Sequence, residues 1–299
     1  MVYYPMGDLV REYRIRQGLT QEQLCEGICT PATLSKIENG LQTPGRRLLE
    51  ALLERLGARY VMQLALLGEK DLCRFLLEQE IDRLFDRKDD TALLTKINEY
   101  EKETDSGNVL ERQYILWCRA LYEEKRSKPV KQVQKWLIEA LQCTVQKFSM
   151  QMQFENRLFT IMEIRIMYKI CRCEYICKRT KTAKNQVRRI ADYLEKKQLK
   201  DSCGGLYSNI LLTLAEWDAR QRLFEESIAE CEKAICYNTQ KGMIHDLYEL
   251  TSLMSQDYEK LGQSEEAGKY QNYAGVLQEI QFVGFAGGEE NGKELSLRL

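Results

Sequence analysis

Proline is nearly absent from this chain, and that constrains its fold more than any other feature of the sequence. Among 299 residues only Pro5, Pro31, Pro44 and Pro129 occur, so none interrupts the stretch from Lys131 to the end. Because proline breaks the interior of a helix, nothing of that kind limits helices in this stretch. Apolar residues recur there at helical spacing, and we therefore expect an all-α fold.

The composition predicts a globular protein that stays inside the cell. The 44 Lys and Arg residues nearly balance 45 Asp and Glu residues, which excludes a strongly basic nucleic-acid coat and an acidic disordered chain. No apolar run is long enough to cross a membrane, and the N-terminus lacks the basic-then-apolar order of a signal peptide. We expect a cytoplasmic protein with no membrane partner, whose eleven cysteines are reduced thiols.

Residues 7–57 carry the most specific pattern, a series of short helices with a clear signal at each start or end. Gly18 ends the first helix. Thr20 caps the second helix, with Gln23 three residues later, and Thr30 caps the third just before Pro31. The outer side of the third helix displays short or polar side chains of a kind that fits the major groove of DNA. These residues are Thr30, Pro31, Ala32, Thr33, Ser35, Lys36 and Asn39.

A fourth helix starts with two arginines after Pro44. Arg46 and Arg47 lie beside the free N–H groups of its first turn, which predicts a clamp for DNA phosphates. Charge alone gives this region little affinity, because residues 1–67 contain eight Lys and Arg against seven Asp and Glu. Two copies on a pseudo-palindromic site would bind more tightly, so we expect a homodimer.

Beyond residue 68 the sequence predicts helical hairpins in tandem. The expected pairs are 70–87 with 90–104, 109–126 with 129–147, 151–178 with 184–198, 203–220 with 224–238, and 243–262 with 264–282. Phe224–Ser227 and Ala234 in one pair match Ser264–Ala267 and Ala274 forty residues later. The pattern resembles degenerate tetratricopeptide repeats, and a generic helical bundle is the alternative. We expect a head with its linker at 1–67, a repeat body at 68–282 and a flexible tail at 283–299.

A tetratricopeptide-like body has a concave surface that commonly holds an extended peptide. The first helix of each of the last two hairpins would line this surface. The residues that would point into it are Asn209, Leu212 and Glu216 in 203–220, and Glu249, Ser252 and Gln256 in 243–262. Asn209 is the strongest candidate, because an amide both donates to and accepts from a peptide backbone. An ordinary exposed helical asparagine is the alternative.

The middle of the chain is basic. From Arg165 to Lys200, twelve Lys and Arg residues oppose three Asp and Glu residues, a net charge of +9. Arg165, Lys169 and Arg172 fall at helical spacing and are candidates to bind the carboxylate or acidic side chains of a peptide. Solvated outer faces of helices are the simpler interpretation, and direct contact with DNA is a third.

Signals of enzyme or metal chemistry are poor, so we expect a protein that is not an enzyme and uses no cofactor. His245 is the only histidine, which excludes a site built from a histidine pair. The densest cysteine group is Cys171, Cys173 and Cys177, where only the last two share a helix face and no CxxC motif occurs.

The tail at 283–299 is expected to be flexible, and the alternative is that it docks as an extended segment on the body or on a dimer partner.

The head resembles the helix-turn-helix of the Cro and phage-repressor (Xre) superfamily, on residues 18–25 and 34–40 and on Thr43-Pro44. The resemblance implies that Gln21 and Asn39 bind backbone phosphates and that Glu38 is structural. It places Pro31, Ala32 and Lys36 at base-reading positions. The turn departs from the usual pattern, since it lacks the common glycine and is one residue short.

With its repeat body, the chain resembles the peptide-pheromone-responsive regulators of the Rgg, PlcR and PrgX type from Gram-positive bacteria. That resemblance implies a homodimeric transcription regulator that binds a double-stranded DNA operator and a short signalling peptide. The peptide would change the spacing or orientation of the two heads through a linker at Gly57–Gly68. A scaffold or constitutive regulator without a peptide effector, and a protein that acts on a partner through its body, are the alternatives.

Overall fold

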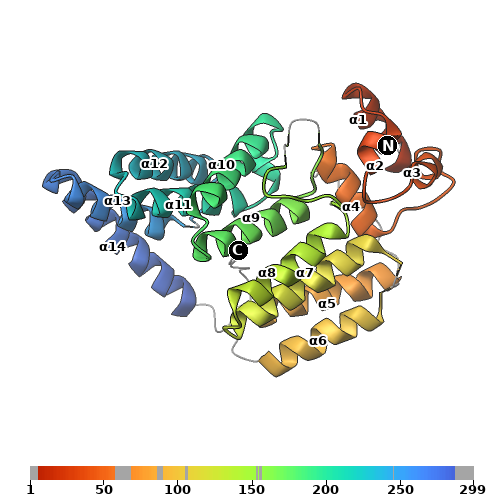
Figure 1. Cartoon of the computed structure of the whole chain (residues 1–299), viewed down its shortest axis with the longest axis horizontal. Helices are drawn as coiled ribbons and strands as arrows, with labels where there is room; N and C mark the ends of the chain where they lie inside the picture. Colours follow the sequence, from red (N-terminus) through yellow and green to blue (C-terminus); the bar gives the residue numbers. More distant parts are fainter. Residues whose placement is uncertain are drawn as a thin grey trace. The chain divides into compact units, whose positions relative to one another are not determined.

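The computed structural model describes residues 6–57, 69–85, 90–104, 107–152, 154, 157–244 and 246–286. Every regular element in these ranges is a helix, fourteen of them α-helices, and none is a strand (Figure 1). The all-α expectation is therefore confirmed. The chain forms two compact units, one running from Met1 to Gln186 and including Lys196–Ser202, the other comprising Val187–Glu195 and Cys203–Leu299.

The head lies in the first unit and consists of α1 to α4. These helices span Met6–Arg16, Gln21–Cys25, Pro31–Glu38 and Arg46–Arg55. Both predicted caps are present: Thr20 forms a full capping box with Gln23, and the Thr30 hydroxyl accepts the backbone N–H of Thr33. Helix α1 packs closely on α3, because a Cβ added to Gly7 would lie 1.9 Å from the carbonyl oxygen of Ile37.

The rest of the first unit is built from helices that each pack on the next. They are α5 (Glu69–Phe85), α6 (Asp90–Lys102), α7 (Val109–Lys125), α8 (Val130–Gln142) and α9 (Ile161–Ile176). Helix α9 begins ten residues later than the sequence suggested. The reason is a capping box, in which the Thr160 hydroxyl accepts from the backbone N–H of Glu163 and the Glu163 carboxylate accepts from that of Thr160.

The second unit is a series of helical hairpins. After α10 (Thr180–Lys196), which contributes to both units, come α11 (Leu206–Arg220), α12 (Phe224–Gln240), α13 (Leu247–Lys260) and α14 (Ser264–Ala286). The small residues of the repeat pattern are buried where successive helices pack together, as Ser227, Ala234, Ala267 and Ala274 show. Small side chains at these positions let neighbouring helices approach closely, and the body is tetratricopeptide-like.

Several expectations concern residues outside the described ranges. They include most of the coupling linker, the tail from Gly287 onward and His245. Helix α14 continues to Ala286, four residues past the expected end of the body. No helix in the described ranges combines the length and the apolar character that a membrane crossing requires.

Candidate nucleic-acid interface

Helix α3 buries one face and exposes the other. Leu34 and Ile37 lie in the core of the head, and Glu38 is buried beside them. On the opposite side the residues proposed to read DNA reach the surface. Thr30, Pro31, Ala32, Lys36 and Asn39 are exposed, and Thr33 and Ser35 are partly exposed.

Hydrogen bonds hold the two ends of α3 in place. At its start the hydroxyl groups of Thr30 and Thr33 lie 2.9 Å apart, and Thr30 also accepts the N–H of Thr33 at 3.1 Å. At its end the Asn39 amide donates to the carbonyl oxygen of Ser35 at 2.8 Å. Side chains ordered in this way lose less conformational freedom when they meet a ligand.

A buried carboxylate joins α1, α2 and α3. Arg14 donates from Nε and Nη2 to the two oxygens of Glu38 at 2.6 and 2.8 Å, and Gln21 Nε2 donates to Glu38 at 2.8 Å. Burial works to raise the pKa of Glu38, but the bonds from Arg14 and Gln21 outweigh it and lower that pKa. Gln21, expected at a DNA phosphate, therefore uses one amide hydrogen inside the head and has a second left to donate.

Arg46 and Arg47, predicted to clamp DNA phosphates, both contact a carboxylate of the protein. Arg47 Nη2 donates to Glu78 Oε1 at 2.6 Å, and Arg46 Nη2 donates to Glu78 Oε2. The two arginine side chains are only 12 and 13% exposed. Carboxylates of the protein thus occupy both guanidinium groups and turn them away from solvent, which weighs against the predicted phosphate clamp.

Further groups complete this arrangement, which we call the Glu78 cluster. The Tyr100 hydroxyl lies 2.8 Å from Glu78 Oε1 and also within hydrogen-bond distance of Glu111, and its single hydrogen can be donated to either carboxylate. Arg47 Nε lies 2.9 Å from Glu111 Oε2. The Arg47 guanidinium stacks 3.9 Å above the centre of the Tyr114 ring. Its charged members are Arg46, Arg47, Arg74, Glu50, Glu78 and Glu111, with opposite charges in equal number.

Burial and charge act in opposite directions on Arg47. Burial favours the neutral guanidine, but the carboxylates of Glu78 and Glu111 outweigh it and raise the pKa of Arg47. Sequence reasoning missed these partners. One local signal was present, since Glu78 precedes the fully buried Ile81 by three residues and so shares its helix face. An acidic residue on an apolar helix face needs a buried partner.

The residues proposed for peptide binding in the first unit share helix α9. Lys169 is buried and its ammonium lies 2.7 Å from Glu124 Oε2, so its charge is already neutralised by α7. Arg165 and Arg172 are partly exposed, and the Arg172 guanidinium lies 5.9 Å from the centre of the Tyr168 ring. Of the three, the structure leaves the two arginines with surface to offer a ligand.

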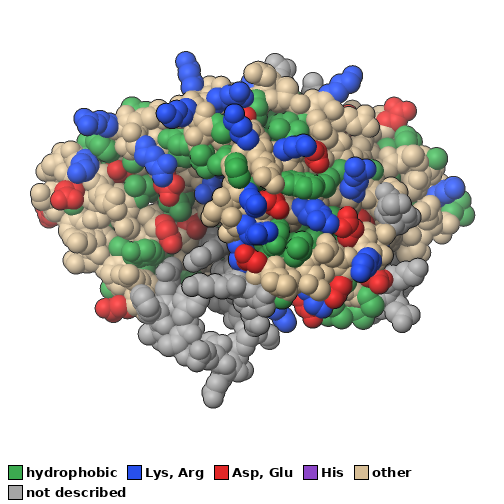
Figure 2. Space-filling model, turned by 60° about the horizontal axis from the view of Figure 1, so that its bottom comes forward, with side chains coloured by type: hydrophobic (Ala, Val, Ile, Leu, Met, Phe, Trp, Pro, Cys, Tyr) green, Lys and Arg blue, Asp and Glu red, His purple; other side chains and the backbone are tan. Residues whose placement is uncertain are grey.

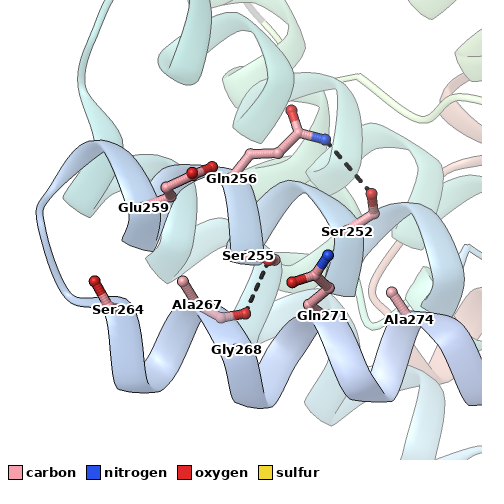
Figure 3. A pocket seen from close by; sticks show the side chains of 9 residues that line it. All are labelled: Ser252, Ser255, Gln256, Glu259, Ser264, Ala267, Gly268, Gln271 and Ala274. Carbon is pink, nitrogen blue, oxygen red and sulfur yellow. Dashed lines mark hydrogen bonds between the residues drawn. The ribbon is translucent and has the colours of Figure 1, made fainter.

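In the second unit the proposed residues lie on α11 and α13. Leu212 is buried and packs in the core, whereas Asn209 and Glu216 are partly exposed. Ser252 and Gln256 line a hollow of about 400 Å³ between α13 and α14 (Figure 3). Its walls are small or polar, and Gln256 Nε2 lies 3.5 Å from the Ser252 hydroxyl.

The described residues offer little other chemistry. They contain no group of three or more side chains able to hold a metal ion. Cys171 and Cys173 are buried, and burial raises the pKa of Cys173 to about 11, so that its thiol stays protonated. On the face shown in Figure 2, basic and acidic side chains are interspersed rather than gathered by sign.

Comparison with known proteins identifies the domain family of the head. Residues 5–63 match the model of a helix-turn-helix domain. No curated protein sequence matches the chain. The chain therefore joins an N-terminal helix-turn-helix domain to a tetratricopeptide-like helical body.

The fold as a whole is similar to that of PlcR from Bacillus thuringiensis. The structure of PlcR with the peptide PapR7 and DNA has 17% identity and a TM-score of 0.60, over 97% of this chain and 100% of PlcR. The apo form of PlcR has 14% sequence identity and a TM-score of 0.56, over 97% of this chain and 99% of PlcR. Aspartyl phosphate phosphatase F from Bacillus subtilis shares the fold less closely. It has 13% sequence identity and a TM-score of 0.51, over 94% of this chain and 76% of the phosphatase.

Proposed function

We propose that the protein is a cytoplasmic, homodimeric transcription regulator that binds operator DNA through α3 and is controlled by a short peptide bound to its body. The exposed face of α3 carries the DNA-binding part of this proposal. Lys36 supplies a long cationic donor in the middle of that face, and Thr30 and Thr33 supply hydroxyl groups near its start. Donors of these kinds read base edges in the major groove.

Gln21 and Asn39 flank this face and suit the phosphates on either side. The Gln21 amide has a hydrogen in excess of its bond to Glu38. The Asn39 amide donates to the Ser35 carbonyl oxygen at 2.8 Å and lies 3.4 Å from the Ser35 hydroxyl, so we propose that it exchanges the longer contact for a phosphate. Arg46 and Arg47 are left out of the proposal because Glu78 binds them. With so few charges available, a single head would bind weakly, which supports the use of two heads on a two-fold site.

The peptide-binding part of the proposal rests on polar groups along the first helices of the hairpins. In the second unit these are Asn209 and Glu216 on α11, and Ser252 and Gln256 on α13. In the first unit Arg165 and Arg172 could bind acidic groups. The fold likeness adds support, because PlcR was crystallised with a peptide and DNA.

Selection of binding sites from random double-stranded DNA tests the first part. We expect the full chain to enrich a pseudo-palindromic sequence, and Lys36→Ala to weaken its binding by about 1–3 kcal/mol. Lys135→Ala is the matched control, because Lys135 is an exposed lysine on α8 and should leave affinity unchanged. Equal affinity of the Lys36 variant and the wild type would contradict the assignment of α3 as the reading helix.

Titration calorimetry tests the second part. Short peptides encoded beside the gene should give saturable heat with the wild-type protein and a weaker signal with Asn209→Ala. Glu225→Ala, a change in the first turn of α12, is the control. Absence of saturable heat with all such peptides, together with intact operator binding, would favour a constitutive regulator over a peptide-controlled one.

A further inference from the structure

We propose that Glu78, on body helix α5, is a positioning residue for DNA reading: it fixes α4, and with it the DNA-reading helix α3, in one orientation relative to the body helices α5 to α9 of the same unit. The inference rests on the proposed DNA-binding function and deepens it. It assigns to the body a direct part in orienting the head, through contacts between residues far apart in the sequence.

The first anchor is at the start of α4. Each oxygen of the Glu78 carboxylate accepts a hydrogen bond from a different arginine, Arg46 or Arg47. Tyr100 and Glu111 bind Arg47 as well, from α6 and α7. Because one carboxylate holds two neighbouring guanidinium groups, the first turn of α4 cannot shift without breaking at least one charged contact.

The second anchor is at the other end of the same helix. Glu54 Oε2 accepts the backbone N–H of Ile161 at 2.9 Å, and Arg55 Nη2 lies 3.4 Å from Glu163 Oε1. Arg55 Nη1 also donates to the carbonyl oxygens of Leu24 and Glu26 at 2.9 and 2.7 Å, which ties α4 to α2. Helix α4 has ten residues and is therefore about 15 Å long. Two anchors this far apart fix its tilt as well as its position.

A third contact lies at the turn between α2 and α3. Gly27 has a φ of +74°, and a Cβ added there would lie 2.0 Å from the carbonyl oxygen of Thr144. The backbone of the head thus touches the backbone of the body directly before the reading helix. Apolar packing contributes less, since Leu110 on α7 is the one body residue in the buried core cluster of the described head.

None of these contacts covers the reading face. The body holds α4 and the turn before α3, while Pro31, Ala32, Lys36 and Asn39 remain exposed. The arrangement therefore fits aiming rather than blockade. A dimer must present two heads about 34 Å apart along the DNA, and a head of fixed orientation loses less freedom on binding.

The test compares Glu78→Gln with Glu80→Gln in the full chain. Glu80 lies on the same helix but is 49% exposed and pairs with Lys96 at the surface. We expect Glu78→Gln to lower affinity for the two-fold operator by about tenfold and to relax its preference for half-site spacing, with affinity for a single half-site unchanged. Glu80→Gln should match the wild type in all three measurements.

Hydrogen exchange of the DNA-free protein supplies a second readout. The amides of α4 should exchange faster in Glu78→Gln than in Glu80→Gln, and Tyr100→Phe, which keeps the ring, should show a smaller change. Wild-type affinity and spacing preference in Glu78→Gln would overturn the inference, and tighter operator binding would show that the contact blocks the head. If the wild type binds no DNA sequence, the proposed function fails instead.

Discussion

The buried carboxylate of Glu38 offers a direct test of how the head is held together. Glu38 is 2% exposed and accepts three hydrogen bonds, two from Arg14 and one from Gln21. Replacing it with glutamine keeps its size but removes the charge and puts an amide donor opposite the donors of Arg14. The substitution therefore leaves a buried cation with part of its hydrogen bonding unmet.

The cost follows from the burial of both partners. Breaking a buried ion pair by removing one partner costs about 3–5 kcal/mol, and Arg14 keeps 13% exposure and a bond to the carbonyl oxygen of Leu19, which favours the lower limit. A loss of about 3 kcal/mol in a unit of this size lowers the midpoint of thermal unfolding by about 6–12 °C. Circular dichroism during heating measures that midpoint.

The effect of Glu38→Gln should also depend on pH. Because the folded protein lowers the pKa of Glu38, its contribution is present above the pKa of the unfolded chain, about 4.3, and is lost as pH falls through the folded value. The difference between wild type and variant should be constant near neutral pH and should narrow in acid. Glu12→Gln, which removes an exposed pair with Arg16, is the control. A Glu38→Gln midpoint equal to that control at neutral pH would refute the reasoning.

Two further substitutions test backbone contact and burial. Gly27→Ala should destabilise the protein more than Gly40→Ala in urea unfolding, because both glycines have positive φ but only Gly27 lies against the Thr144 carbonyl; equal losses would contradict a tight contact. In the second unit, burial raises the pKa of Asp257 although the Ser227 hydroxyl opposes it, so stability falls as pH rises through that pKa. Asp257→Asn should therefore raise the thermal unfolding midpoint above that of the wild type at pH 7. A midpoint below that of the wild type would argue against a destabilising charge on Asp257.

Local signals account for what the sequence predicted well. Thr20 and Thr30 mark helix starts through contacts with residues only three positions away, and the structure has both caps. The hairpins of the body follow from helical periodicity and from small residues such as Ser227 and Ala234. The start of α9 was missed because apolar residues continue upstream of Thr160 and conceal its capping box.

The contacts of Arg46 and Arg47 could not be predicted from the local sequence. Their position at the start of a helix is compatible with a phosphate or with a carboxylate of the protein, and the sequence near them does not choose between the two. The choice depends on Glu78, more than thirty residues away. Long-range ion pairs of this kind depend on how helices pack, which the local pattern does not encode.

Because contacts with the body hold α4 at both ends, the head cannot be joined to a different body without losing them. A chimera that joins this head to a different body would need acceptors equivalent to Glu78 and Glu111 and a carbonyl placed like that of Thr144. Without them, Arg46 and Arg47 would become exposed cations, free to bind any DNA phosphate. Such a hybrid would trade sequence discrimination for general affinity, so the head and the first half of the body should be exchanged together.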